Sequence, residues 1–135
     1  ENHGEYFSRI NVVSKILREV SSPNLRLNLD TGNFVLAGDD PVKAVSELEQ
    51  WVVHVHAKDV SLDGKPCAPG EGCLDFQLVI DRLRSTGYEG FLSVEYEGDK
   101  DQLLGTGIGL GYLKALLLKQ AIVKHYSNPG EGLGF

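Results

Sequence analysis

The sequence predicts an α/β fold in which parallel strands alternate with helices. Three short runs rich in strand-forming residues, at positions 25–30, 51–57 and 91–95, are separated by longer segments with apolar residues at helical spacing. Strands that are separated by helices pair in parallel. Each strand-helix unit takes about 30 residues, so the chain has room for roughly four units. Four units make half of a (β/α)8 barrel, which needs about 250 residues; a flavodoxin-like or Rossmann-like sheet is the alternative.

The helical segments have recognisable sequence signals. Apolar residues recur every three or four positions over 6–20. Asp40, which is followed by proline, and Asp75 are typical N-caps for the next two helices. A last helix is expected over about 110–125. The connections rich in polar residues, glycine and proline are expected to be loops, over 31–39 and 58–73.

Composition narrows the possible functions. Hydrophobic residues make up 41% of the 135 residues and charged residues 24%, which indicates a globular chain. The net charge of −6 argues against a nucleic-acid partner. No stretch approaches the roughly 18 apolar residues of a membrane helix, and no signal peptide is visible. Cys67 and Cys73 match neither a redox nor a zinc motif, so we expect free thiols in a cytoplasmic protein.

Charged or metal-ligating residues follow the predicted strands. Asp30, His56 and Glu95 lie at the ends of the three strands, and Glu1 precedes a helix as a strand-end residue would. Ligands bind at the carboxyl ends of strands in parallel α/β folds. Each of these residues alone is common as a capping or surface group. Together, three carboxylates and one imidazole favour a site for Mn²⁺, Co²⁺, Mg²⁺ or Zn²⁺.

Five motifs extend this pattern over most of the chain. They are ENHG (1–4), LDTGN (29–33), HVHAKD (54–59), PGEGCLDF (69–76) and GYEGFLSVE (87–95). In this order they resemble the xylose isomerase-like TIM-barrel superfamily, which contains sugar and sugar-phosphate isomerases and epimerases and the second family of apurinic endonucleases. The resemblance is nearest to ketose or pentulose-phosphate 3-epimerases. It implies that residues 1–126 are the C-terminal half of a barrel and that 127–135 are a flexible glycine-rich tail.

The resemblance also implies a ligand set and a mechanism. One divalent metal ion is held by Glu1, Asp30, His56 and Glu95. The metal stabilises the enediolate that forms when a proton is removed next to a ketone. Glu1 and Glu95 are the implied catalytic pair, because one carboxylate removes the proton and the other returns it to the opposite face.

Several nearby residues are candidate substrate contacts. Asn33 is similar to a family position that contacts substrate hydroxyls, with a turn-forming asparagine as the alternative. His3 and Lys58 could reach substrate oxygens or a phosphate, or be solvated loop residues. Glu71 could make a polar contact from the rim loop. We expect His54 to pack beneath His56, because the two share one face of the strand.

The glycine run GTGIGLG at 105–111 lacks the spacing of a dinucleotide-binding motif. Glycines before a helix can expose backbone N–H groups to a phosphate. A flexible linker is the alternative that we favour. The run therefore leaves open whether the substrate is phosphorylated.

Three alternative functions remain at this point. A sugar-acid or inositol dehydratase would use the same metal ligands. An apurinic endonuclease of the endonuclease IV type is disfavoured for two reasons. That family has a DxxH motif where this chain has asparagine at position 33, and the loop 61–70 of this chain contains no histidine. A carbohydrate-binding fragment without catalysis is the third.

The expected partners follow from the length of the chain. It has no methionine, begins at Glu1 and is about half as long as a complete barrel needs. We therefore expect a piece of a longer protein, or a processed one. A missing N-terminal half-barrel or a second copy of the chain would close the sheet, whose edges are otherwise unpaired. The expected ligand is a small sugar or sugar phosphate.

Overall fold

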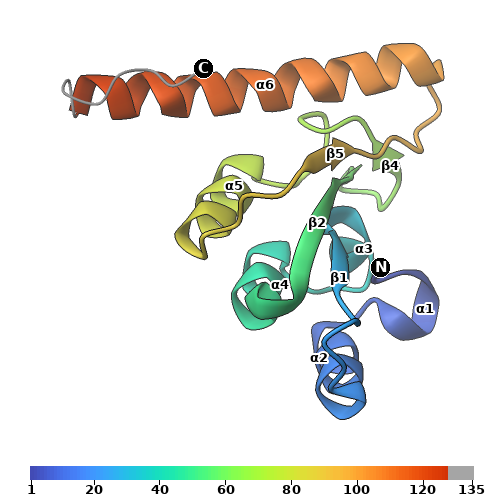
Figure 1. The fold of residues 1–135 in the computed structure, drawn as a ribbon. Helices are drawn as coiled ribbons and strands as arrows, with labels where there is room; N and C mark the ends of the chain where they lie inside the picture. Colours follow the sequence, from blue (N-terminus) through green and yellow to red (C-terminus); the bar gives the residue numbers. More distant parts are fainter. Residues whose placement is uncertain (128–135) are drawn as a thin grey trace.

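The centre of the molecule is a parallel sheet of three strands. The computed structural model describes residues 1–127. Its sheet has the order β1 (Leu27–Asp30), β2 (Val52–Ala57) and β5 (Leu92–Val94), and both pairings are parallel (Figure 1). The three predicted strands are thus confirmed to within two residues at each end. Alternating leucines form β1, and a run of β-branched residues and histidines forms β2.

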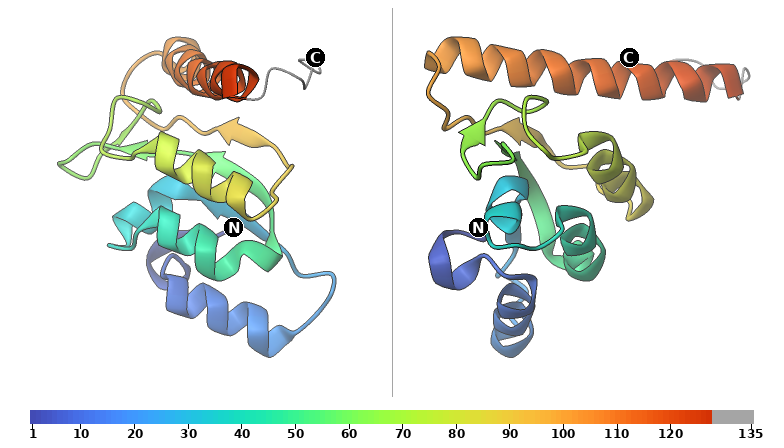
Figure 2. Two further views of the ribbon diagram at one scale, coloured as in Figure 1. Left: turned by 90° about the vertical axis from the view of Figure 1, so that its left-hand side faces the viewer. Right: turned by 180° about the vertical axis from the view of Figure 1, so that it is seen from behind.

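Helices cover one face of this sheet. α2 (Ile10–Val20), α4 (Pro41–Leu48) and α5 (Phe76–Ser85) form one layer beside the strands (Figure 2). A short 3₁₀ helix, η1 (Glu49–Trp51), joins α4 to β2. Their apolar faces bury a core with the strand residues that point the same way, including Leu27, Leu29, Val45, Leu48, Val55 and Leu83. Burial of these aliphatic side chains contributes most to holding helices and sheet together.

The opposite face of the sheet is polar. The alternation of side chains places Asn28 and Asp30 of β1, His54 and His56 of β2, and Ser93 of β5 on it. The ring of His54 meets that of His56 edge-on, and its Nε2 lies 2.9 Å from the Ser93 hydroxyl. The prediction that His54 packs beneath His56 is therefore confirmed. This face presents hydrogen-bonding groups where the helical face presents aliphatic side chains.

Two predicted segments differ near the first strands. The expected helix over 6–20 is divided into α1 (Gly4–Phe7) and α2, and the expected loop over 31–39 contains a helix, α3 (Thr31–Leu36). α3 starts directly at the end of β1 because the Asp30 carboxylate accepts a hydrogen bond from the Asn33 backbone N–H at 2.6 Å.

The connection between β2 and α5 is organised by one buried acid. It contains a small antiparallel pair, β3 (Asp59–Val60) and β4 (Pro66–Cys67), where we expected only a loop. Asp59 is fully buried and accepts hydrogen bonds from four backbone N–H groups, those of Val60, Gly70, Gly72 and Leu74. Such saturation by backbone donors holds a long connection in one shape.

The last helix starts earlier than predicted. α6 runs over Gln102–Ser127, so the glycine run lies inside it and is neither a linker nor an exposed phosphate loop. The helix tolerates these glycines because two of them, Gly105 and Gly109, lie close against Tyr96 and Pro69. The predicted flexible tail overlaps α6 at Ser127, and residues 128–135 lie outside the described part of the chain. No helix within residues 1–127 is long and apolar enough to cross a membrane.

Candidate metal centre

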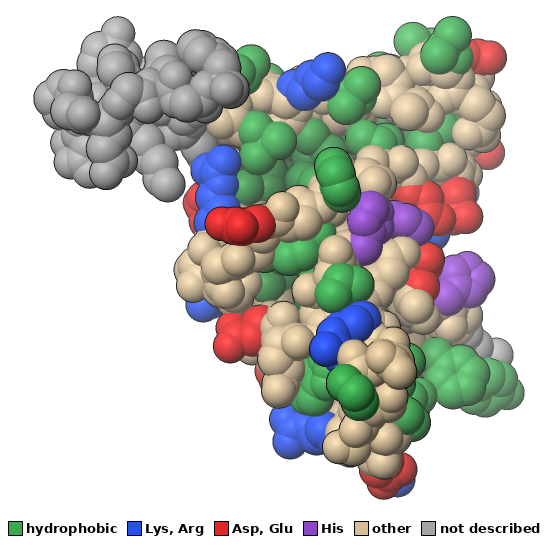
Figure 3. Space-filling view, in the orientation of Figure 1, with side chains coloured by type: hydrophobic (Ala, Val, Ile, Leu, Met, Phe, Trp, Pro, Cys, Tyr) green, Lys and Arg blue, Asp and Glu red, His purple; other side chains and the backbone are tan. Residues whose placement is uncertain are grey.

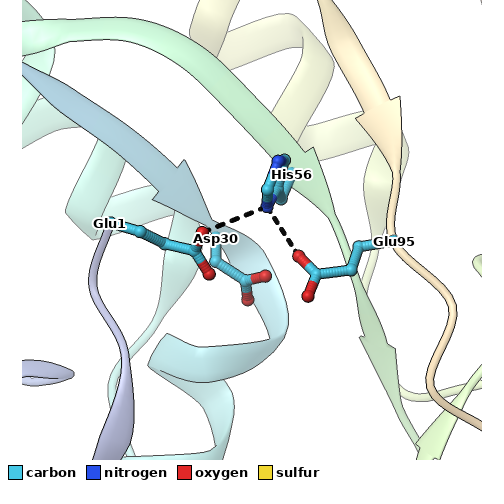
Figure 4. A group of neighbouring side chains, drawn as sticks. All are labelled: Glu1, Asp30, His56 and Glu95. Atoms are coloured by element: carbon cyan, nitrogen blue, oxygen red, sulfur yellow. Dashed lines mark ion pairs between the residues drawn. The ribbon is translucent and has the colours of Figure 1, made fainter.

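The four predicted ligands come together at one end of the sheet. Each offers one ligand atom, and these atoms all lie within 4.8 Å of one another. Asp30 ends β1, His56 lies on β2 and Glu95 directly follows β5, while Glu1 approaches from the chain start, as Figure 4 shows. Glu95 is held beside β2 because its backbone N–H bonds to the carbonyl of Ala57 at 3.1 Å. Histidine and acidic side chains lie side by side on this face in Figure 3.

The cluster is buried on one side and open on the other. Nδ1 of His56 lies 2.6 Å from Oε2 of Glu95 and 3.4 Å from Oε2 of Glu1. Asp30 is completely buried, whereas the side chains of the other three are each about a quarter exposed. Glu1 and Glu95 approach from opposite sides, with His56 and Asp30 between them (Figure 4). An ion held here would keep a face free for a substrate.

The donor set fits a divalent cation. Oδ2 of Asp30 is buried and accepts no hydrogen bond within the described residues, and the buried Oε2 of Glu95 lies against Nδ1 of His56. A buried carboxylate oxygen that accepts no hydrogen bond is costly, and a cation would satisfy it. Three carboxylates and one imidazole suit the borderline and hard divalent ions. The assignment of these four residues as ligands stays a prediction, and the geometry is what such a site requires.

Two asparagines that the sequence analysis did not select hold the ligands in place. Asn2 is buried and pairs with the backbone of Asp30, accepting from its N–H at 2.7 Å and donating to its C=O at 3.0 Å. This pairing ties the segment that carries Glu1 to the end of β1. The side-chain nitrogen of Asn28 lies 3.1 Å from Oε2 of Glu1 and 3.2 Å from Nε2 of His56. Asn28 could have been selected from the sequence, because it lies two residues before Asp30 and therefore on the same face of the strand.

Asn33 lies against the cluster, and its contact with a substrate stays a prediction. Its side-chain nitrogen donates to the Asn2 carbonyl at 3.0 Å and lies 3.4 Å from Oε1 of Glu1. Its backbone N–H caps Asp30, so the turn-forming role is present as well. Burial raises the pKa of Asp30 to about 7 against the opposing effects of this hydrogen bond and of Lys58. A metal ion would therefore compete with a proton for Asp30 near neutral pH.

Lys58 is part of the cluster and not a solvated loop residue. It is 1% exposed, and its Nζ lies 2.8 Å from Oε2 of Glu97, 3.3 Å from Oε1 of Glu95 and 3.8 Å from Oδ2 of Asp30. Burial alone would lower the pKa of Lys58, but the hydrogen bond to Glu97 and the two further carboxylates raise it. Burial would by itself raise the pKa of Glu95, but Asp30 and Lys58 lower it below its usual value.

His3 and Glu71 lie outside the cluster. His3 is exposed and precedes α1 without capping it through its side chain. Glu71 forms an ion pair with Lys100 at the rim, where the loop between β4 and α5 meets the segment before α6. Substrate contact by either residue stays a prediction.

A cavity of about 370 Å³ opens beside the cluster. It lies between α1 and α3 and is lined by Gly4, Ser8, Arg9, Asn33, Leu36 and Ala37. Asn33 is shared between this cavity and the cluster. The cavity therefore offers room next to the candidate metal site for a small polar molecule. Sequence reasoning did not find it, because it depends on the break between α1 and α2 and on α3.

Comparison with known proteins decides the family. The family model described as xylose isomerase-like TIM barrel matches residues 1–116 of the chain. The chain belongs to this family. The family assignment confirms the resemblance drawn from the five motifs, and it makes the three parallel strands and their helices part of a (β/α)8 barrel architecture.

Two curated relatives illustrate the range of the family. The rhizopine catabolism protein MocC of Rhizobium meliloti is 33% identical in an alignment of 104 positions that covers 64% of this chain and 32% of that protein. An inosose dehydratase of Clostridium beijerinckii is 28% identical in an alignment of 105 positions that covers 64% of this chain and 35% of that enzyme. The chain thus spans about a third of the length of these relatives.

Solved structures agree on the fold. A xylose isomerase domain protein from Planctomyces limnophilus superposes with a TM-score of 0.73 at 25% identity, covering 82% of this chain and 44% of that one. A D-tagatose 3-epimerase-like protein gives a TM-score of 0.66 at 26% identity, covering 88% of this chain and 46% of that one. By name, these relatives are an inosose dehydratase, a xylose isomerase domain protein and a D-tagatose 3-epimerase-like protein.

Proposed function

We propose that the protein is a metal-dependent isomerase or epimerase of a sugar or sugar phosphate, active when this chain is part of a complete barrel. The observation that carries the proposal is the pair Glu1 and Glu95, which approach from opposite sides of His56 and Asp30 with all four ligand atoms within 4.8 Å. Two carboxylates so placed can exchange a proton with both faces of one carbon.

The chemistry follows from that arrangement. A bound divalent ion supplies a Lewis acid for the ketone oxygen and makes the neighbouring C–H more acidic. The pKa of Glu95 is lowered in this site, so its side chain is an ionised carboxylate and would act as the base. Glu1 lies across the cluster and would return a proton from the other side. Asn33, which borders both cluster and cavity, would bind substrate hydroxyls.

A dehydratase is the second candidate, because a relative is named inosose dehydratase. Both reactions begin with removal of a proton next to a ketone. In an epimerase the proton returns on the opposite face, and in a dehydratase a hydroxyl group leaves from the neighbouring carbon instead. The products of one incubation therefore separate the two candidates.

The proposed partners follow from the polar face of the sheet. β1 and β5 each have an edge with no strand partner among residues 1–127. Unpaired strand edges and a polar sheet face are usual where more strands complete a barrel. We propose that further chain, or a second copy, closes the sheet around a small sugar. Within the described residues only one group of candidate metal ligands occurs, which disfavours the three-zinc phosphodiesterase alternative.

Deuterium exchange tests the proposal. The complete barrel that contains this chain is incubated with Mn²⁺ in D₂O with D-tagatose, D-fructose or an inosose, and NMR follows deuterium at the carbon next to the ketone. We expect exchange that needs Mn²⁺ and that falls by at least about 100-fold in Glu95→Gln, the size usual for loss of a general base. Glu47→Gln on α4, whose side chain pairs with Lys43 at the surface, should exchange like the wild type. Equal exchange in Glu95→Gln would contradict the assigned role.

A further inference from the structure

The ammonium group of Lys58 has no hydrogen left for a substrate. A lysine ammonium carries three donors. Three acceptors surround Nζ of Lys58: Oε2 of Glu97 at 2.8 Å, Oε1 of Glu95 at 3.3 Å and Oδ1 of Asn33 at 3.4 Å. The side chain is also 1% exposed. Lys58 is therefore placed to act on neighbouring side chains and not on a substrate.

The two carboxylate oxygens of Glu95 have different partners because Lys58 contacts one of them. Oε1 faces Lys58 at 3.3 Å, while Oε2 faces Nδ1 of His56 at 2.6 Å and accepts no hydrogen bond from another residue of the described chain. The contact with Lys58 thus determines which oxygen of Glu95 points into the cluster. Glu97, half exposed at the rim, holds the ammonium from the other side.

Two residues of α3 fix the path of the Lys58 side chain. The hydroxyl of Thr31 bonds to both the N–H and the C=O of Lys58, at 3.1 and 2.7 Å. The aliphatic stem then passes over Gly32 in α3, where an added Cβ would lie 2.5 Å from Cγ of Lys58. Glycine at position 32 is therefore needed for the ammonium to reach Glu95.

We propose that Lys58 is a positioning residue that holds Oε1 of Glu95, so that Oε2 alone is offered to a metal ion. It thereby orients one carboxylate of the proposed catalytic pair and does not touch the substrate. This inference rests on the proposed metal site. It gives the lysine of the HVHAKD motif a role that the sequence did not separate from substrate binding.

Cobalt titration of the full chain distinguishes orientation from charge. Removing a positive charge beside three carboxylates would by itself tighten the binding of a divalent cation. Loss of orientation acts in the opposite direction, and groups that orient metal ligands typically contribute about 10- to 100-fold in affinity. We therefore expect Lys58→Met to raise the Kd for Co²⁺ at least about tenfold. The visible spectrum of the bound Co²⁺ should also change, because Glu95 is no longer held in one orientation.

Two further variants make the test decisive. Gly32→Ala keeps every polar group but displaces the Lys58 stem, so it should weaken Co²⁺ binding in the same direction, and it decides the question if Lys58→Met does not fold. Lys100→Met removes a lysine whose ion pair with Glu71 lies outside the cluster, and it should bind Co²⁺ like the wild type. A folded Lys58→Met protein with unchanged or tighter binding and an unchanged spectrum would overturn the proposal. Absence of Co²⁺ binding in the wild type would instead overturn the metal site itself.

Discussion

At the scale of single residues, Asp30 shows how one side chain serves both fold and site. Its Oδ1 caps α3 through the Asn33 N–H, and its Oδ2 is buried in the ligand cluster without a hydrogen-bond partner among residues 1–127. The strand therefore ends, the helix begins and the candidate ligand is fixed at one position. Its place at a strand end made the ligand role predictable from sequence.

Two substitutions of Asp30 separate these roles. Asp30→Asn keeps an oxygen that can accept the Asn33 N–H, whereas Asp30→Ala removes it. Both should lose metal affinity, because neither offers a carboxylate. Only Asp30→Ala loses the helix cap as well, so urea unfolding of the metal-free proteins should show it to be less stable than Asp30→Asn by about 1 kcal/mol. Equal stability of the two variants would show that the cap contributes nothing to α3.

At the scale of elements, the glycines of α6 differ in what surrounds them. Gly109 packs against β5 and the rim loop, because an added Cβ would lie 2.6 Å from Cδ of Pro69 and 3.1 Å from Cγ1 of Val94. Gly107 lies two residues away with nothing within 4 Å of the same position. Close approach of α6 to the sheet therefore depends on one face of the helix only.

Alanine at these two positions should have opposite effects. Gly107→Ala should stabilise the protein by up to about 1 kcal/mol, because alanine is the better helix former. Gly109→Ala should destabilise it by about 1–3 kcal/mol, because the helix must move away from Pro69. Thermal or urea unfolding measures both. Stabilisation by both variants would mean that α6 does not pack as described.

The same element shows where sequence reasoning ended. Alternating leucines and β-branched runs predicted the strands, because strand periodicity is local. The start of α6 was missed, since glycine is a poor helix former and only contacts with Tyr96 and Pro69 explain its use. The α3 helix and the β3–β4 pair were missed for a similar reason. They depend on hydrogen bonds that the carboxylates of Asp30 and Asp59 accept from backbone N–H groups up to 15 residues away.

At the scale of the whole molecule, the two faces of the sheet have different roles. Helices α2, α4 and α5 cover one face of the sheet (Figure 2), where aliphatic side chains are buried. The other face presents polar side chains, and the ligand cluster lies at one end of it. All four candidate ligands lie within a chain that covers less than half of the related structures. The site could be anticipated because Asp30, His56 and Glu95 lie at or next to strand ends. Its supporting residues Asn2 and Glu97 required the three-dimensional arrangement.

Titration with Mn²⁺, followed by the EPR signal of the free ion, tests the central claim most directly. The account predicts saturable binding of one ion per folded chain. It also predicts that His56→Gln, which removes the imidazole between Glu1 and Glu95, abolishes or strongly weakens this binding. A folded wild-type protein that takes up no Mn²⁺, or a His56→Gln variant that binds it as tightly, would contradict the metal centre on which the proposed function depends.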